Sequence, residues 1–308
     1  LATYPDKVKA FWSYGPDERV DKVADAASRL QDKFDASLRR VKDFNTREDI
    51  FGLPVSEYDL LTTVVEQFAP FYQVWTMSSD FGQHKEDWLN GMLVELDSQD
   101  IEKRVQDTLQ ASIRLTKVFA DKPMPRLVAA KLRDSVSEFK RYVPIISCLA
   151  SPALQDRHWE QISTKIGHAV NGKQFLSLQQ LVNWGVMEHM SDIKDISVVA
   201  GKEYALHTAL EAMKAEWGPL RFTCVPYKNT DTHIITGVDE VLALLDDQLV
   251  KVQAIRGSPF VGPIEVACKA WEARLMDTAV VLEAWMTFQR TWLYLEPIFG
   301  SEDIMRQM

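Results

Sequence analysis

Apolar residues recur at three- and four-residue spacing along most of this sequence, and this pattern restricts the fold more than any other feature. The clearest stripe, within 18–45, consists of Val20, Val23, Ala27, Leu30, Phe34, Ser37, Val41 and Phe44. Residues at this spacing share one face of an α-helix. A seam this narrow suits a coiled-coil-like contact with another helix, and it equally suits a helix that packs on its own domain.

The same spacing predicts helices over much of the remaining chain. They cover 57–77, 83–97, 98–120, 126–142, 153–166, 175–184, 202–217 and 238–255. A last stripe consists of Ile264, Cys268, Trp271, Leu275, Thr278, Leu282, Trp285 and Gln289, and it reaches Trp292. Pro144, Ser151 and Pro152 indicate a short connector between helices.

Residues 221–236 depart from the helical spacing. Two segments, 221–227 and 232–236, alternate in polarity as strands do, and 228–231 has the composition of a turn. Pro226 indicates a position whose backbone nitrogen faces away from the partner strand. We therefore expect a mostly α fold, an elongated array of helical bundles with one short β-hairpin near 221–236. Two helical subdomains are expected to meet near 195–202.

The charge and the cysteines narrow the classes of function. The net charge is −9 and the densest basic run lies at 39–42, so we expect no nucleic-acid partner and no membrane partner. Cys148, Cys224 and Cys268 lie far apart, which is typical of a reducing cytoplasmic compartment, and we expect buried or inert thiols. The sequence has no CxxC or HxxxH spacing for a metal. Neither end resembles a natural terminus, and we expect a fragment of a longer protein.

One segment has the outline of a phosphate-binding loop. The run from Gly167 to Lys173 has the required glycines and lysine, but Gln174 replaces the Ser or Thr that would hold Mg²⁺. Such a loop follows a buried strand, whereas 159–166 has the pattern of an amphipathic helix. We interpret His158, at the start of that helix, as structural rather than as a general base. We expect no enzyme, no cofactor and no metal, and a nucleotide-binding enzyme is the weakest alternative.

The last hundred residues carry a series of motifs whose order is informative. The series consists of Lys202 to Tyr204, Met213 to Trp217, the hairpin, Gly237 to Glu240, Leu245 to Asp247, Arg256 to Phe260, Gln289 to Phe299 and Ser301 to Ile304, with Asp156 to Trp159 upstream. This order resembles the linker region of dynein heavy chains, also called heavy-chain N-terminal region 2. The resemblance is strong over 201–308 and weaker towards residue 56. Pro297 resembles axonemal, inner-arm-type chains rather than cytoplasmic ones.

The resemblance implies a mechanical role. Residues 1–50 would form a neck or tail helix, 56–198 a first linker subdomain and 199–308 a second, which together make the N-terminal half of the linker. In dyneins the linker is a bent helical rod across a ring of six AAA+ modules, and its swing is the power stroke on microtubules. The implied partners are the AAA+ ring of the same heavy chain and tail-associated chains near 1–50. The implied location is the cytoskeleton, in the axoneme of a cilium or flagellum.

Four residues near the end of the last stripe are candidates for the mechanical path: Arg290, Trp292, Tyr294 and Glu296. We expect Trp292 to lie in the core, where replacement by Ala would cost about 3–5 kcal/mol. We expect Arg290 to reach a carboxylate such as that of Glu296. The alternative function is a helical scaffold or adaptor that binds partner helices through 18–45.

Overall fold

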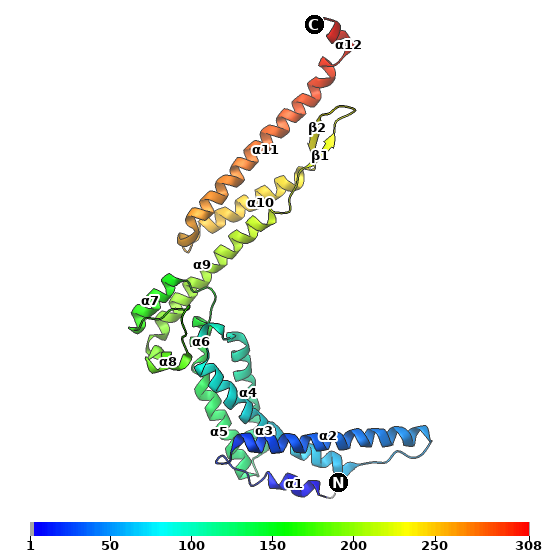
Figure 1. Ribbon diagram of the computed structural model, residues 1–308, viewed down its shortest axis with the longest axis vertical. Coiled ribbons are helices and arrows are strands. Elements are labelled where there is room, and N and C mark those ends of the chain that lie inside the picture. The colour runs from blue at the N-terminus through cyan, green and yellow to red at the C-terminus, as the bar shows by residue number, and fades with distance from the viewer. Residues whose placement is uncertain (1–2, 308) are drawn as a thin grey trace. The chain divides into compact units, whose positions relative to one another are not determined.

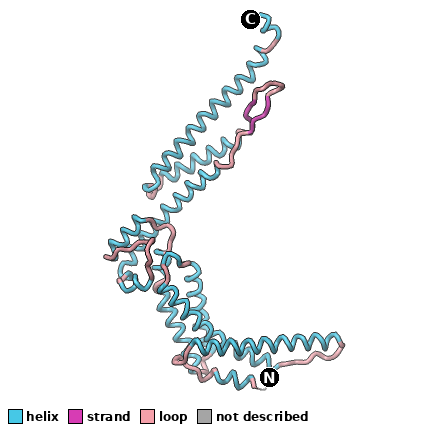
Figure 2. Tube along the Cα trace, in the orientation of Figure 1, coloured by secondary structure: helices cyan, strands magenta, loops and turns pink. Residues whose placement is uncertain are grey.

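The computed structural model describes residues 3–307, and the chain divides into two compact units, Leu1–Ser197 and Val198–Met308. Helices dominate both units, and the two strands described in the second unit pair as an antiparallel hairpin (Figures 1 and 2). The predicted fold class, mostly α with a short hairpin, is confirmed. None of the described helices is long and apolar enough to cross a membrane. The assignment of 1–50 to a neck, and of the later segments to two linker subdomains, stays a prediction.

The first unit is a succession of helices. They are α1 Tyr4–Ala10, α2 Val20–Ile50, α3 Asp59–Asn90, α4 Ser98–Val118, α5 Pro123–Lys140, α6 Val143–Leu149, α7 Asp156–Ile166 and α8 Leu178–Asn183. Short 3-10 helices lie at Leu93–Glu95 and Val186–His189. The next helix, α9 Met190–Glu216, begins in this unit and continues into the second.

The helices α1, α2 and α3, together with the end of α4 and the first half of α5, enclose one core of the first unit. Its centre is aromatic: the ring centroids of Phe34 in α2 and Phe68 in α3 are 5.4 Å apart, and Phe11, just after α1, lies 5.1 Å from Phe68. The part of α2 from residue 23 to residue 34 supplies buried residues to this core, whereas Phe44 and Ile50 are exposed. Over this half of α2, the predicted seam is therefore used for packing within its own unit.

A second core lies between the C-terminal half of α3 and the helices α4 to α8. Trp88 of α3 and Phe139 of α5 lie with ring centroids 5.2 Å apart, and Phe81 adds a third ring 6.2 Å from Phe139. Apolar residues of α7 and α8, including Ile162 and Leu181, close this core and are fully buried. The first unit thus has two adjoining cores that share the long helix α3.

Several helix boundaries differ from those predicted. We predicted separate helices at 57–77 and 83–97, but α3 is continuous through Pro70 and Gly82. Its buried aromatic residues lie on both sides of the proline, so packing outweighs the backbone hydrogen bond that Pro70 cannot make. Pro144 lies in the first turn of α6 rather than in a connector, because a first-turn N–H has no partner within the helix anyway.

The second unit combines the end of α9 with the hairpin and two long helices. Its elements are β1 Thr223–Pro226, β2 His233–Thr236, α10 Asp239–Arg256, the 3-10 helix Gly262–Ile264, α11 Glu265–Phe299 and α12 Glu302–Gln307. Its core consists of apolar residues of α9, α10 and α11, and a buried amide joins two of these helices. The amide nitrogen of Gln248 donates to the carbonyl of Met213 at 3.1 Å, and its oxygen accepts from the indole N–H of Trp217 at 2.7 Å.

The register of the hairpin determines which backbone groups remain free. Thr223 lies opposite Thr236, and Pro226 lies opposite His233. The N–H of Tyr227 donates to the carbonyl of Thr232 at 2.9 Å, so alternate residues along each strand point their backbone groups inwards. The groups of Ile235 consequently point away from β1, and the nitrogen of Pro226 faces away from β2, as predicted.

Candidate functional site

One face of α11 carries residues spaced seven positions apart: Cys268, Leu275, Leu282, Gln289 and Glu296. Seven residues make nearly two helical turns, so these side chains follow one another along the helix. The first three belong to the core that α11 shares with α10. The last two lie beyond that core, at the level of the hairpin, which runs beside α11 (Figure 1).

Gln289 fixes strand β2 to α11 through its side-chain amide. Its oxygen accepts from the N–H of Ile235 at 2.8 Å, and its nitrogen donates to the carbonyl of Ile235 at 2.9 Å. These are the two groups that point away from β1, so the Gln289 amide pairs with β2 as a neighbouring strand would. The side chain of Gln289 is buried, which keeps water from competing for both bonds.

Glu296 fixes the end of the hairpin. Its carboxylate accepts from the ammonium of Lys228 at 2.6 Å and from the hydroxyl of Tyr227 at 3.0 Å. The ring of Tyr227 also meets that of Trp292 edge-on, with centroids 5.0 Å apart. We call this set the hairpin latch: Gln289, Trp292 and Glu296 on α11, with Ile235, Tyr227 and Lys228 on the hairpin.

The charges of the latch reinforce each other. The hydrogen bond from Lys228 holds the pKa of the Glu296 carboxyl below its usual value, and the same bond raises the pKa of the Lys228 ammonium. Both groups are therefore charged at neutral pH. Because half of the Lys228 side chain is exposed, solvent screens the pair, and its strength depends on ionic strength. The ion pair by itself therefore contributes little to holding the end of the hairpin.

The structure separates the four candidate residues of the sequence. Trp292 and Glu296 lie in the latch, Tyr294 is largely exposed, and Arg290 is exposed with no hydrogen bond or ion pair to another described residue. The expected pairing of Arg290 with Glu296 is wrong, because Lys228 of the hairpin takes that carboxylate. Trp292 is only half-buried, so the cost expected for a core tryptophan does not apply. Whether these residues carry a mechanical path stays a prediction.

Sequence reasoning missed Tyr227 and Lys228. No local pattern identifies them, because their partner Glu296 lies 69 and 68 positions away in the sequence. In the turn, Lys228 adopts a left-handed backbone conformation with φ at 51°.

The segment that resembles a phosphate loop has another role. Gly167 ends α7 in a left-handed conformation, and its N–H donates to the carbonyl of Ser163. The ammonium of Lys173 forms an ion pair with Asp156 at 2.6 Å. His158 accepts from the backbone N–H of Gln155 at 3.1 Å at the start of α7. A helix precedes the segment, as the sequence indicated, and the buried His158 side chain caps the start of that helix.

The three cysteines have different environments, and one of them is not buried, so whether its thiol is inert stays a prediction. Cys268 is buried and Cys148 is half-buried, and burial raises the pKa of both thiols. Cys224, on β1, is exposed, because strand β1 faces solvent on that side. Within 3–307, no group of three or more His, Cys, Asp or Glu side chains is placed to hold a metal ion.

Comparison with known proteins adds a family context to this geometry. The family described as dynein heavy chain, N-terminal region 2, matches residues 61–308. The chain is 38% identical over 290 residues to dynein axonemal heavy chain 1 of Mus musculus, which covers 94% of this chain and 7% of the relative. It is 33% identical over 291 residues to dynein axonemal heavy chain 3 of Homo sapiens, over 94% of this chain and 7% of that relative.

A more distant relative matches a slightly longer stretch. Dynein axonemal heavy chain 12 of Rattus norvegicus is 29% identical over 306 residues, which covers 98% of this chain and 10% of that relative. The chain thus spans a tenth or less of the length of each of these relatives. All three are axonemal chains, as Pro297 had indicated.

Proposed function

Since this chain belongs to the dynein heavy chain family and its residues 61–308 match N-terminal region 2 of such a chain, we propose that it is the N-terminal half of the linker, the lever of a dynein motor. In this proposal, ATP binding and hydrolysis in an AAA+ ring of the same heavy chain change the bend and docking of the linker. The resulting swing moves the motor along microtubules, in the axoneme of a cilium or flagellum. The segment itself performs no catalytic step. The match of 61–308 to this region carries the proposal.

The hairpin latch supports a mechanical role. A lever must transmit force between elements that are distant in sequence, and the latch joins the hairpin to α11 across the whole of α10. The bonds from Gln289 span 54 sequence positions, and the bond from Lys228 to Glu296 spans 68. In this proposal, force on the end of α11 is carried to the hairpin. The contacts are hydrogen bonds and one screened ion pair, which suits an element with two alternative arrangements.

A second face of α11 supports a segment that works within a larger chain. Its large apolar side chains follow helical spacing and are exposed: Val281, Trp285, Phe288, Leu295 and Phe299. Scattered exposed apolar residues are normal, but a continuous row along a helix indicates an interaction surface. We propose that other parts of the heavy chain cover this row. The stripe in α2, by contrast, is buried in its own unit between residues 23 and 34, which gives no support to an adaptor function.

The latch variants test the lever proposal in a complete heavy chain that carries this segment. We expect Gln289→Ala and Glu296→Ala to slow microtubule gliding while ATP turnover stays unchanged, because the motor still hydrolyses ATP but transmits less of the swing. Glu283→Ala is the matched control, since Glu283 is an exposed acid on the same helix. Equal slowing in the control, or an unchanged ratio of gliding speed to ATP turnover in both latch variants, would contradict the proposal.

A binding measurement on the segment alone separates the lever from a nucleotide-binding enzyme. We expect calorimetry with ATP and Mg²⁺ to give no heat of binding, since Lys173 is held by Asp156 in a loop that follows a helix. Micromolar binding that disappears in Lys173→Ala would support the nucleotide-binding hypothesis and contradict the present proposal.

A further inference from the structure

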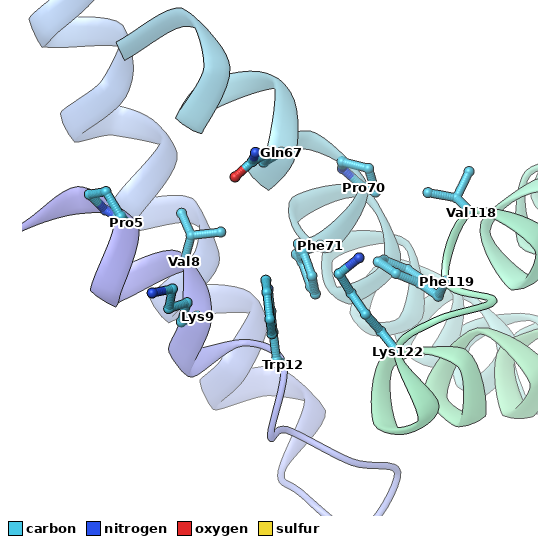
Figure 3. A pocket seen from close by; sticks show the side chains of 10 residues that line it. All are labelled: Pro5, Val8, Lys9, Trp12, Gln67, Pro70, Phe71, Val118, Phe119 and Lys122. Atoms are coloured by element: carbon cyan, nitrogen blue, oxygen red, sulfur yellow. The ribbon is translucent and has the colours of Figure 1, made fainter. Parts of the chain in front are cut away.

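A pocket of about 400 Å³ lies in the first unit between α1, the middle of α3 and the end of α4 (Figure 3). Its floor is formed by Phe71 and Phe119, both fully buried, with ring centroids 5.0 Å apart. Trp12, Pro70 and Val118 line its sides. The volume lies in the range of known small-ligand sites and is large enough for an aromatic side chain with its neighbours.

The pocket is held open by packing that does not involve a ligand. The hydroxyl of Tyr4 bonds with that of Ser37 on α2 at 2.9 Å, and the Tyr4 ring meets Phe34 edge-on at 4.9 Å. Val8 and Phe11 are buried beneath α1. These contacts fix α1 and therefore the position of Trp12, so the site requires little rearrangement to bind a partner.

The rim of the pocket is positively charged in an acidic chain. Lys9 and Lys122 are the charged residues among those that line it, and Figure 3 shows them on either side of Trp12. Lys9 is exposed and makes no hydrogen bond or ion pair with another described residue. The Lys122 ammonium lies 5.4 Å from the centre of the Trp12 ring and 2.9 Å from Asp121. The chain as a whole has a net charge of −9, so the attraction for an acidic ligand is local and comes mainly from the unpaired ammonium of Lys9, because Asp121 already offsets the charge of Lys122.

We propose that this pocket docks a large apolar side chain of a partner polypeptide whose neighbouring residues are acidic. The apolar side chain fills the space above Phe71 and Phe119, and the acidic residues meet Lys9 and Lys122. Trp12 and Val118, at the sides of the pocket, are about half exposed, so apolar surface extends beyond the pocket itself. A polypeptide can cover this surface, whereas a small molecule that fills the pocket alone cannot. The partner must therefore cover the rim as well as fill the pocket. Protein interfaces commonly have one side chain buried in a central pocket and a polar rim around it. This inference does not depend on the lever role.

A short labelled peptide tests the proposal with the whole chain. The probe has a central tryptophan and leucine flanked by two glutamates on each side, and fluorescence polarisation measures its binding. We expect saturable binding that is lost when the flanking glutamates are replaced by lysines or the apolar pair by alanines. Equal binding of the lysine-flanked peptide, no binding of the acidic peptide at millimolar protein, or equally tight binding of free indole would each overturn the proposal.

Substitutions in the pocket locate the binding. Val118→Glu places a carboxylate at the opening, where it repels the acidic flanks of the peptide, and Lys9→Glu reverses the rim charge; each should weaken binding by about tenfold or more. The matched controls are Val250→Glu and Lys42→Glu, which make the same changes at exposed helix positions outside the pocket. Circular dichroism of all four variants verifies that they fold. If a folded pocket variant binds as tightly as its control, the peptide binds elsewhere and the proposal is wrong.

Discussion

Replacement of Gln289 by alanine should detach strand β2 from α11. The change removes one hydrogen bond to the N–H of Ile235 and one to its carbonyl. It leaves those backbone groups in a half-buried position, because Ile235 is packed against the core of the second unit. The hairpin itself remains chemically intact, so the effect should be concentrated where the latch closes.

The size of the effect follows from what replaces the lost bonds. A hydrogen bond that water can replace contributes about 0.5–1.5 kcal/mol, and a buried group left without a partner costs about 1–3 kcal/mol. Two bonds to a half-buried residue lie between these limits, which gives about 2–2.8 kcal/mol in total. At about 1.4 kcal/mol for each factor of ten, the population of the open hairpin should rise about 30- to 100-fold.

Amide hydrogen exchange is the appropriate assay, because the chain has two units and a single melting transition would not report on one strand. The N–H of Ile235 should exchange about 30- to 100-fold faster in Gln289→Ala, in proportion to the open population. Amides of the first unit should exchange as before. Gln253→Ala, an exposed glutamine on α10, is the control and should leave Ile235 unchanged.

A second substitution makes the reasoning refutable through pH. In Gln289→Glu a carboxylate would face the carbonyl of Ile235, so the folded-state pKa of this acid should lie above its unfolded value of about 4.3. The protonated Glu side chain then stabilises the attachment of β2 fully below its unfolded-state pKa, and this stabilisation is lost as pH rises through its folded-state pKa. If Ile235 exchanged at the wild-type rate in Gln289→Ala, or if Gln289→Glu showed no such pH dependence, the paired bonds would not exist in solution.

Three further outcomes are expected. Folding lowers the pKa of Glu296, so its ion pair with Lys228 stabilises the latch above the unfolded pKa, and this stabilisation is lost as pH falls through the folded-state pKa. The hydrogen-exchange rates of the hairpin turn in wild type and Glu296→Gln should therefore differ at neutral pH and become equal in acid. A difference between the two rates that persists in acid would contradict this. Gly172→Ala should destabilise the first unit by about 1–3 kcal/mol, because the added Cβ would lie 2.7 Å from the indole nitrogen of buried Trp159. Thermal melting measures this change, and an unchanged melting temperature would show that the loop shifts to accommodate the Cβ. Cys224 should react with iodoacetamide before the two less exposed cysteines of the folded chain, and equal labelling would mean that β1 is covered.

The elements that sequence reasoning predicted best are those defined by local patterns. Alternation on both sides of a turn located the hairpin within a few residues of its true bounds. The spacing that links Cys268 to Gln289 identified the buried face of α11. Such patterns are readable because neighbouring turns of a helix or alternate residues of a strand share one environment.

The contacts that sequence reasoning missed join residues far apart in the chain. Arg290 and Glu296 are near in sequence, and this favoured pairing them, but the carboxylate is taken by Lys228 of the hairpin, 68 positions away. Likewise, Trp292 lies in an apolar run, which favoured a core position. In the structure the Trp292 side chain is only half-buried, and its ring contacts that of Tyr227 in the hairpin. The continuity of α3 through Pro70 is also a tertiary effect, because only the surrounding core compensates for the missing hydrogen bond.

The manner in which the hairpin is attached also protects the protein from other copies of itself. A free strand edge is a template on which further chains can add strands and aggregate. On β2 one outward position is occupied, because the Gln289 amide bonds to the N–H and the carbonyl of Ile235 that an incoming strand would need. On β1 the residue Pro226 offers no N–H at one of the outward positions. A surface hairpin of this kind can therefore persist in a crowded assembly without recruiting neighbouring chains, and loss of Gln289 should appear at high concentration as β-rich aggregation.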